Sequence, residues 1–251
     1  MKVIATYNIK GGVGKTATAV NLAWLAAPEG APTLVWDLDP QGAASYYYRI
    51  KPRIKGGSKK MLQGKRDLDK HIRGTDFEWL DLLPADFSYR NMDIIFDNTK
   101  KPAEQLKKLL RPFRNEYYYV FLDCPPSISL TSENIFGAAD ALLIPTIPTT
   151  LSLRTYKQVL RFFKQHQLDT IKLLPFFSMV DRRKQLHRSI VDQPDDLLRD
   201  FLATRIPYNS EVEQMGIHRA PVGEFAPSGI AARSYASLWN DTKQKLVNYL
   251  P

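Results

Sequence analysis

A glycine-rich loop near the start of the chain has the residue types that bind phosphate groups. Residues 10–16 read KGGVGKT, between a strand-like apolar run and a helical pattern. Glycines let backbone N–H groups turn inward, and the N-terminus of a helix adds partial positive charge. Lys15 is expected to neutralise the β and γ phosphates of a nucleotide, and the Thr16 hydroxyl to bind Mg²⁺. The residues predicted to surround the phosphates are Gly11, Gly12, Val13, Gly14, Lys15, Thr16 and Ala17.

Three aspartates follow apolar, strand-like runs and are candidates for the same site. Asp37 and Asp39 lie in the sequence WDLDPQ, and Asp123 follows the run YVFL. Parallel strands present their carboxyl ends at one edge of a sheet, so we expect all three carboxylates near the loop. Asp37 and Asp123 are predicted to order the hydration of Mg²⁺, and Asp39 to position the attacking water. Each aspartate has a structural alternative, because strand-end aspartates also cap helices and turns.

The alternation of apolar runs with amphipathic stretches predicts the sheet that positions these residues. Strands are expected at residues 3–7, 33–36, 79–83, 118–122, 141–145 and 171–177. Helices are expected at residues 16–27, 103–113, 151–166, 189–202 and 230–249. Because helices between strands act as crossover connections, the pattern predicts an α/β fold of the P-loop NTPase, or Rossmann-like, type. Its central sheet is expected to be mainly parallel, with helices on both faces.

Length and composition limit the class of the protein. The 251 residues, 44% of them hydrophobic, are expected to form a single domain spanning residues 1–251. The chain has no apolar run long enough for a transmembrane helix and begins without a secretory leader pattern. Its one cysteine, Cys124, allows no internal disulfide and cannot alone hold a metal cluster. These features predict a cytoplasmic protein.

The net charge of +9 is distributed unevenly along the chain. Residues 1–48 are neutral overall, residues 49–75 carry +8, residues 76–150 carry −4 and residues 151–251 carry +5. The basic stretch fits a polyanionic partner, or alternatively a solvated loop whose lysines serve solubility. The glycines and proline of residues 50–75 favour a mobile insertion into the domain.

The chain resembles the ParA/MinD family of deviant Walker ATPases, and within it the ParA branch. The motifs that carry the resemblance are KGGVGKT at 10–16, DLDPQG at 37–42, LDLLPA at 80–85, LDCPPSIS at 122–129 and IPYNSEV at 206–212. The resemblance implies an ATPase that binds Mg-ATP and forms a homodimer with the nucleotides between its subunits. Lys10, Lys15 and Asp39 are the implied catalytic residues. Lys10 is expected to reach the nucleotide of the partner subunit, and Asp39 to be required for hydrolysis.

The resemblance also predicts an adenine site and reveals departures from the family pattern. Met179, Pro207 and Asn209 are expected to hold the adenine, with Asp181 nearby. Ala17 stands where the family usually has a second threonine, so a hydroxyl near the α phosphate is missing. Tyr208 stands where many members have an arginine, and Ile9 where an ordinary P-loop has its first glycine.

DNA and a regulatory protein are the partners that the ParA branch implies. Its members bind DNA without sequence specificity as ATP dimers and release it after a ParB-like or adaptor protein stimulates hydrolysis. The chain is therefore expected to be nucleoid-associated and to segregate or position a plasmid, a chromosome or a protein body. The residues predicted to contact DNA phosphates are Arg182, Arg183, Lys184, Arg188, Arg199, Arg205 and Arg219, with residues 49–73 as a second possibility.

Two alternative functions share the phosphate loop. A MinD-like membrane-associated ATPase would be expected to end in a basic amphipathic helix, but residues 240–251 have few basic residues and end in proline, so no membrane binding is expected. A metabolic P-loop enzyme, such as an amide synthase or a kinase, would instead show turnover of a small substrate. An iron–sulfur reductase of the nitrogenase iron-protein type needs two cysteines per subunit, which the chain lacks.

Overall fold

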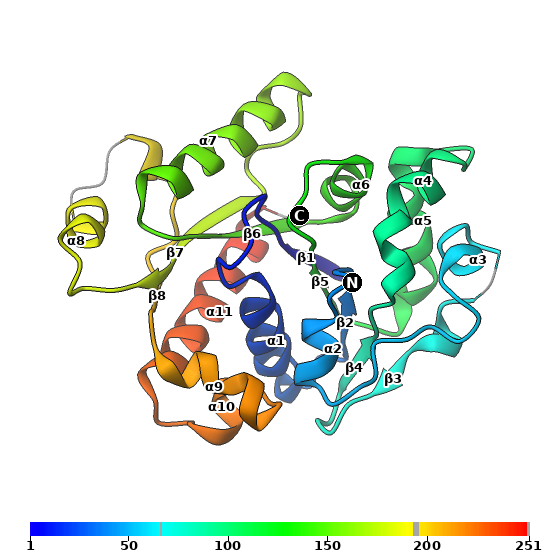
Figure 1. Ribbon diagram of the computed structural model, residues 1–251, viewed down its shortest axis with the longest axis horizontal. Coiled ribbons are helices and arrows are strands. Elements are labelled where there is room, and N and C mark those ends of the chain that lie inside the picture. Colours follow the sequence, from blue (N-terminus) through cyan, green and yellow to red (C-terminus); the bar gives the residue numbers. More distant parts are fainter. Residues whose placement is uncertain (66, 193–195, 250–251) are drawn as a thin grey trace.

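A single sheet of eight strands runs through the molecule in the order β3-β4-β2-β5-β1-β6-β7-β8 (Figure 1). The computed structural model describes residues 1–65, 67–192 and 196–249. The strands are β1 Lys2–Thr6, β2 Thr33–Asp37, β3 Arg73–Gly74, β4 Leu80–Leu83, β5 Tyr119–Asp123, β6 Ala141–Thr146, β7 Leu173–Val180 and β8 Arg205–Pro207. All neighbouring strands are parallel except β3 and β4, which confirms the predicted mainly parallel sheet.

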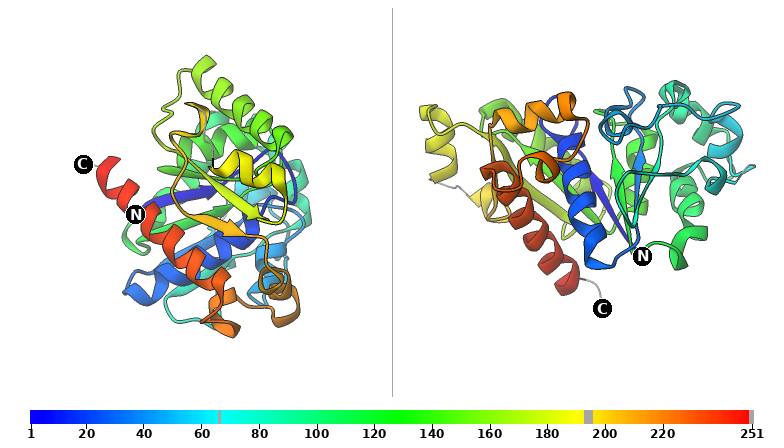
Figure 2. Two further views of the ribbon diagram at one scale, coloured as in Figure 1. Left: turned by 90° about the vertical axis from the view of Figure 1, so that its left-hand side faces the viewer. Right: turned by 90° about the horizontal axis from the view of Figure 1, so that it is seen from below.

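Helices cover both faces of the sheet, as predicted (Figure 2). One face carries α1 Lys15–Ala26, α2 Ala43–Tyr47, α9 Ser210–His218, α10 Val222–Phe225 and α11 Ile230–Tyr249. The other carries α4 Met92–Asp97, α5 Gln105–Leu110, α6 Leu130–Ala138 and α7 Thr150–Gln165. Two further helices, α3 Lys59–Leu62 and α8 Gln185–Asp192, lie toward opposite ends of the sheet (Figure 1). The 3₁₀ helices are Ala27–Glu29, Asp69–His71, Phe87–Asn91, Pro102–Glu104, Arg111–Asn115 and Asp196–Leu198.

The two layers follow from the alternation of side chains along each strand. Val3 and Ala5 of β1 pack into the core on the α7 side, whereas Ile4 between them packs against the α1 side. In β5, Leu122 and Phe121 divide between the same two cores. Strands buried on both faces therefore appear in the sequence as continuous apolar runs. Among the described residues, no helix is both long enough and apolar enough to cross a membrane.

The sequence analysis placed one helix wrongly and left several elements unpredicted, among them α2, α4, α6, α9 and α10. The predicted helix at 189–202 is wrong, since α8 covers Gln185–Asp192 and the next described turn is a short 3₁₀ helix. Pro194, which cannot donate a backbone hydrogen bond, interrupts the predicted span, and residues 193–195 lie outside the described residues. The edge strands β3 and β8 were not predicted, because each is too short to show an alternating pattern.

Candidate nucleotide-binding site

The glycine loop connects β1 to α1 at the carboxyl edge of the sheet. Gly12 and Gly14 have φ angles of 68° and 94°, a left-handed conformation that favours glycine. A Cβ atom on Gly14 would also lie 3.0 Å from the Ser178 hydroxyl. Helix α1 begins directly after Gly14, and no side chain caps its N-terminus. The first N–H groups of α1 are thus open to an anion, as a phosphate site requires.

Lys15 lies inside this loop and is only 7% exposed. Its Nζ atom donates a hydrogen bond of 3.0 Å to the carbonyl oxygen of Lys10. Burial lowers the pKa of Lys15, and electrostatic interaction with Asp123, and to a smaller extent with Cys124 and Asp39, opposes that decrease. A buried ammonium group enclosed by the loop is suited to neutralise phosphate.

Lys10 has a fixed backbone and an unengaged side chain. Its N–H donates to Asn8 Oδ1 at 2.9 Å, and Asn8 Nδ2 donates to the carbonyl oxygen of Pro145 at 2.9 Å. The Lys10 side chain is half-buried and has no hydrogen bond or ion pair with the described residues. Asn8, which the sequence analysis did not single out, therefore holds the start of the loop against the end of β6.

Two carboxylates meet beside the loop because β2 and β5 are adjacent and in register. Asp37 pairs with Asp123 across the two strands, and both side chains are fully buried. Within the described structure, both carboxylate oxygens of Asp123 and Oδ1 of Asp37 have no hydrogen-bond partner. Burial, and then the charge of Asp37, raises the pKa of Asp123 well above its usual range. Orphaned carboxylate oxygens close to Thr16 fit the hard oxygen ligands and hydration shell of Mg²⁺.

The second oxygen of Asp37 is tied to Ser45, the third residue of α2. It accepts hydrogen bonds from the Ser45 N–H at 2.8 Å and the Ser45 hydroxyl at 2.7 Å. The Ser45 hydroxyl in turn accepts a bond of 3.0 Å from the N–H of Ala85, directly after β4. Burial raises the pKa of Asp37 to about 7, although both bonds from Ser45 oppose the shift. Ser45 is a positioning residue that the sequence analysis missed.

The stability of the nucleotide-free protein is predicted to decrease as pH rises from about 4 to about 7. Folded Asp37 keeps its proton in this range while the unfolded chain releases it, so the raised pKa favours folding only at the lower pH. One such proton corresponds to a slope of about 1.4 kcal/mol per pH unit. Urea unfolding should show a shallower slope in Asp37→Asn, which keeps an acceptor for Ser45. Equal slopes in the two proteins would contradict the shift.

Asp39 is half-buried in the turn after β2. Its Oδ1 atom accepts a hydrogen bond from the N–H of Gln41 at 2.9 Å, and its carbonyl oxygen accepts one from Gly42 at 2.9 Å. Its other carboxylate oxygen receives no hydrogen bond from the described residues. The turn thus fixes the backbone of Asp39 and leaves one carboxylate oxygen available.

A pocket of about 170 Å³ adjoins the loop on the side of β7 and β8. The structure brings Met179, Pro207 and Asn209 together there with Gly12 and Gly14 of the loop. The lining residues that the sequence analysis did not name in this role are Ser178, Ile206, Tyr208, Val212, Glu213 and Tyr235. An apolar pocket continuous with a phosphate loop is suited to a nucleotide base.

Asp181, which was expected beside this pocket, does not line it. Its carboxylate binds Arg183 at 2.9 Å, and this hydrogen-bonded pair lowers the pKa of Asp181 to about 2. Asn209 Oδ1 accepts the N–H of Glu211 at 2.7 Å and so caps α9. The amide nitrogen of Asn209 has no partner among the described residues.

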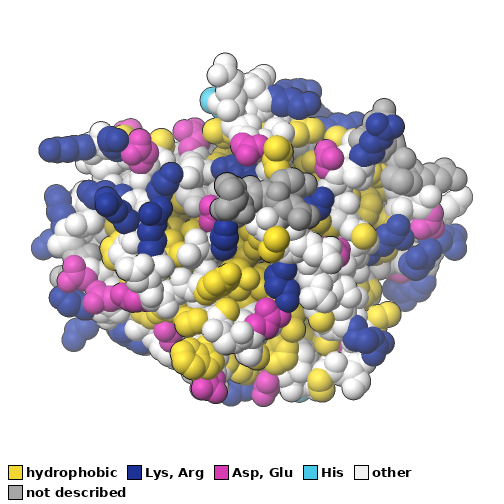
Figure 3. Space-filling view, turned by 180° about the vertical axis from the view of Figure 1, so that it is seen from behind, with side chains coloured by type: hydrophobic (Ala, Val, Ile, Leu, Met, Phe, Trp, Pro, Cys, Tyr) yellow, Lys and Arg dark blue, Asp and Glu magenta, His cyan; other side chains and the backbone are white. Residues whose placement is uncertain are grey.

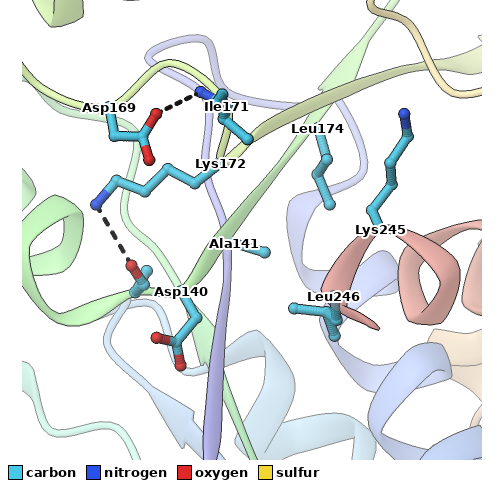
Figure 4. A pocket seen from close by; sticks show the side chains of 9 residues that line it. Asp140, Ala141, Asp169, Ile171, Lys172, Leu174, Lys245 and Leu246 are labelled. Carbon is cyan, nitrogen blue, oxygen red and sulfur yellow. Dashed lines mark hydrogen bonds between the residues drawn. The ribbon is translucent and has the colours of Figure 1, made fainter. Parts of the chain in front are cut away.

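A second pocket of about 190 Å³ lies at the opposite edge of the sheet (Figure 4). It contains Asp140, Asp169 and Lys172, together with Lys245 and Leu246 of α11. Lys172 donates hydrogen bonds to the carbonyl oxygens of Phe136 and Ala139 at the end of α6. The ammonium group of Lys172 is thus bound to the carboxyl end of α6.

The predicted DNA-contact residues are only partly grouped. Arg182 and Arg205 both form ion pairs with Asp192, at 3.2 and 3.4 Å. Arg219 binds the carbonyl oxygen of Tyr46 and lies over its ring, away from α8. Arg183 binds Asp181 as described above. Lys184, Arg188 and Arg199 are exposed on or near α8.

The glycine loop after β1 and the carboxylates beside it place the chain among the P-loop ATPases. A family model described as an AAA domain matches residues 1–174. Over 243 residues the chain is 31% identical to the sporulation initiation inhibitor protein Soj of Bacillus subtilis, covering 94% of this chain and 96% of that protein. The chain belongs to the ParA/Soj family of deviant Walker ATPases, which confirms the resemblance seen in its motifs.

Solved structures with this fold hold ATP analogues. A putative plasmid partition protein from Borrelia burgdorferi bound to AMPPNP has a TM-score of 0.81 at 21% identity, covering 97% of this chain and 99% of that chain. Cobyrinic acid a,c-diamide synthase from Mycobacterium smegmatis, with a bound ATP analogue and magnesium, has a TM-score of 0.79 at 25% identity, covering 96% and 93%. The fold therefore serves both a partition protein and a synthase.

Proposed function

We propose that this ATPase binds Mg-ATP at the phosphate loop, dimerises around the nucleotides and couples hydrolysis to the positioning of a cargo. The observation that supports this most directly is the side chain of Lys10. Its backbone is fixed by Asn8, yet its ammonium group forms no hydrogen bond or ion pair with any described residue. A lysine supplied to the partner's nucleotide would add positive charge to the phosphates only in the dimer.

Apolar side chains beside the loop support a dimer at this edge. Ile128, in the loop after β5, is 48% exposed, and Leu151, at the start of α7, is 66% exposed. Strands β5 and β6 flank β1, so these two side chains lie at the same edge of the sheet as Lys10. Exposed apolar side chains around a polar centre are typical of a surface that becomes buried in an interface.

The residues of the loop and its neighbours have separate roles in binding and hydrolysis. Lys15 and the N–H groups of α1 bind the β and γ phosphates, and Lys10 of the partner would complete the charge. Thr16 would hold Mg²⁺, with Asp37 and Asp123 ordering its hydration, and the ion would neutralise phosphate oxygens. Asp39 has a free carboxylate oxygen with which to orient a water molecule toward the γ phosphate. Met179, Pro207 and Asn209 would hold the base.

Replacement of Lys10 by methionine is expected to prevent dimerisation with Mg²⁺ and a non-hydrolysable ATP analogue. The wild-type protein should be a dimer with the analogue and a monomer with ADP, as measured by light scattering. Lys2→Met is the matched control, because it removes the same charge from the other end of β1. A Lys10→Met protein that dimerises like the wild type would refute the role of Lys10.

The same proteins test the DNA step of the proposal. Wild-type protein with ATP should bind duplex DNA of unrelated sequence, and binding should weaken steeply with salt, as phosphate contacts require. ADP and the Lys10→Met substitution should each abolish this binding. If the wild type binds no DNA with any nucleotide, the ATPase assignment remains but the DNA-based positioning function is overturned.

A ParB-like or adaptor protein is the proposed stimulator of hydrolysis.

A further inference from the structure

The basic segment, which we define as residues 49–66, has no counterpart in the proposed mechanism. It contains eight lysines and arginines and no acidic residue. Of its described residues, Lys51, Arg53, Lys59, Lys60 and Lys65 are exposed and form no ion pair with the described part of the chain. In Figure 3, dark-blue side chains lie toward both the left and the right of the molecule, and the left is the end that carries α3 to α5 in Figure 1. These five side chains therefore form a concentrated positive surface.

Buried apolar side chains lie beneath this surface. Ile54, Met61 and Leu62 are at most 2% exposed and belong to the core on the α7 side. The N–H of Ile54 donates to Asp86 at 2.7 Å, and Gln105 donates to the carbonyl oxygen of Leu62 at 2.8 Å. The segment is thus anchored by these apolar residues, while the five charged side chains named above are exposed. Such anchoring reduces the ordering cost when the charges contact a ligand.

The group around α8 is less suited to phosphate. Arg182 and Arg205 already share Asp192, and Arg183 is bound to Asp181. To contact a phosphate, these arginines would have to give up or share a carboxylate partner. Exposed pairs are individually weak, but the nearby carboxylates also repel a polyanion. Three arginines of the group around α8 are thus paired with carboxylates, whereas Lys51, Arg53, Lys59, Lys60 and Lys65 form no ion pair with the described residues.

The chemistry of the segment favours the backbone of duplex DNA over two other anionic partners. No large apolar side chain of residues 49–65 is exposed, so the segment has nothing to insert into a lipid bilayer. It contains no aromatic residue on which single-stranded bases could stack. Lysines on an anchored backbone make contacts with phosphates that do not depend on base sequence.

The segment is also connected to the nucleotide site. Ser45 receives the N–H of Ala85 and donates to Asp37, and the next residue, Asp86, holds the backbone of Ile54. The loop after β4 therefore contacts the basic segment directly and Asp37 through Ser45. A rearrangement around Asp37 on nucleotide binding would be transmitted to the segment through Ser45, Ala85 and Asp86.

We propose that Lys51, Arg53, Lys59, Lys60 and Lys65 form the principal surface by which this protein contacts the phosphates of duplex DNA. The inference rests on the DNA-binding step of the proposed function and assigns that step to the α3 end of the molecule. The group around α8 then has a minor part in the contact.

The salt dependence of DNA binding tests this assignment. We would measure the affinity for a short duplex of unrelated sequence by fluorescence anisotropy, with a non-hydrolysable ATP analogue, across a salt series. Lys59→Ala/Lys60→Ala should weaken binding and reduce the slope of log affinity against log salt by about 1.8, since each phosphate contact contributes about 0.9. Lys184→Ala/Arg188→Ala should leave the slope close to that of the wild type. The matched control is Lys157→Ala/Lys164→Ala, which removes two exposed charges from α7.

The possible outcomes separate the inference from the function on which it rests. If the wild type binds DNA and the α3 variant keeps its slope, the assignment to the basic segment is overturned and the DNA step stands. A slope that is reduced only in the Lys184→Ala/Arg188→Ala variant overturns the assignment and places the DNA contact at α8. If the wild type binds no duplex with any nucleotide, both the DNA step and this inference fail. Thermal melting of each variant checks that the fold is retained.

Discussion

Replacement of Lys15 by methionine should weaken the binding of Mg-ADP and Mg-ATP by about 100-fold. Lys15 is the buried ammonium group of the loop, and hydrogen bonds to charged groups contribute about 1.5–3 kcal/mol each. Methionine keeps the length and apolar stem of the side chain and removes only the charge. Isothermal titration with Mg-ADP measures the effect in the monomer, without a contribution from dimerisation.

Lys10→Met is the matched control for this experiment. It removes the same charge from the same loop, but from a side chain that is not enclosed by it. We expect Lys10→Met to bind Mg-ADP like the wild type. Comparable losses in both variants would mean that the two lysines act on the same nucleotide, and undiminished affinity in Lys15→Met would remove the phosphate-loop assignment.

The phosphate loop was predictable because its residues are contiguous. The glycines needed at Gly12 and Gly14, the lysine and the start of α1 all lie within one short stretch of sequence. The meeting of Asp37 with Asp123 was also predictable, although they are far apart in the chain. It required only the rule that parallel strands end at the same edge. Their register, which makes them direct neighbours, came from the structure.

The residues that hold the site in place were not predictable. Asn8 matters because it reaches the end of β6, and Ser45 matters because α2 turns back toward β2. Serine and asparagine are common in loops, and nothing in the local sequence distinguishes these two from the others. Tyr235 reaches the base pocket from α11 at the other end of the chain. Their roles depend on tertiary contacts, which cannot be predicted from the spacing of apolar residues along the sequence.

The way the basic segment packs was also not predictable from the sequence. The prediction of a mobile insertion rested on its charge and glycines, and the structure adds that Ile54, Met61 and Leu62 pack into the core. These apolar residues are too few and too irregularly spaced to show a helical or strand period. Burial of three side chains, rather than composition, determines how the segment is held.

The substitution Asp39→Asn should reduce ATP hydrolysis by about 10²- to 10⁴-fold while leaving nucleotide binding and dimerisation intact. Asparagine keeps the Oδ1 acceptor that holds the Gln41 N–H, so the turn after β2 is preserved. What it removes is the negative oxygen available to orient water, and loss of such a group usually costs a factor of this size. Steady-state hydrolysis and light scattering with ATP measure the two properties separately.

Asp169→Asn is the matched control for this variant. Asp169 accepts the N–H of Ile171 at 2.9 Å, the same two-residue turn that Asp39 makes with Gln41, but at the opposite edge of the sheet. It should hydrolyse ATP at the wild-type rate. Normal turnover in Asp39→Asn would show that another group positions the water. A combined loss of hydrolysis and dimerisation would instead place Asp39 in the interface, because the charge would then be needed before the chemical step.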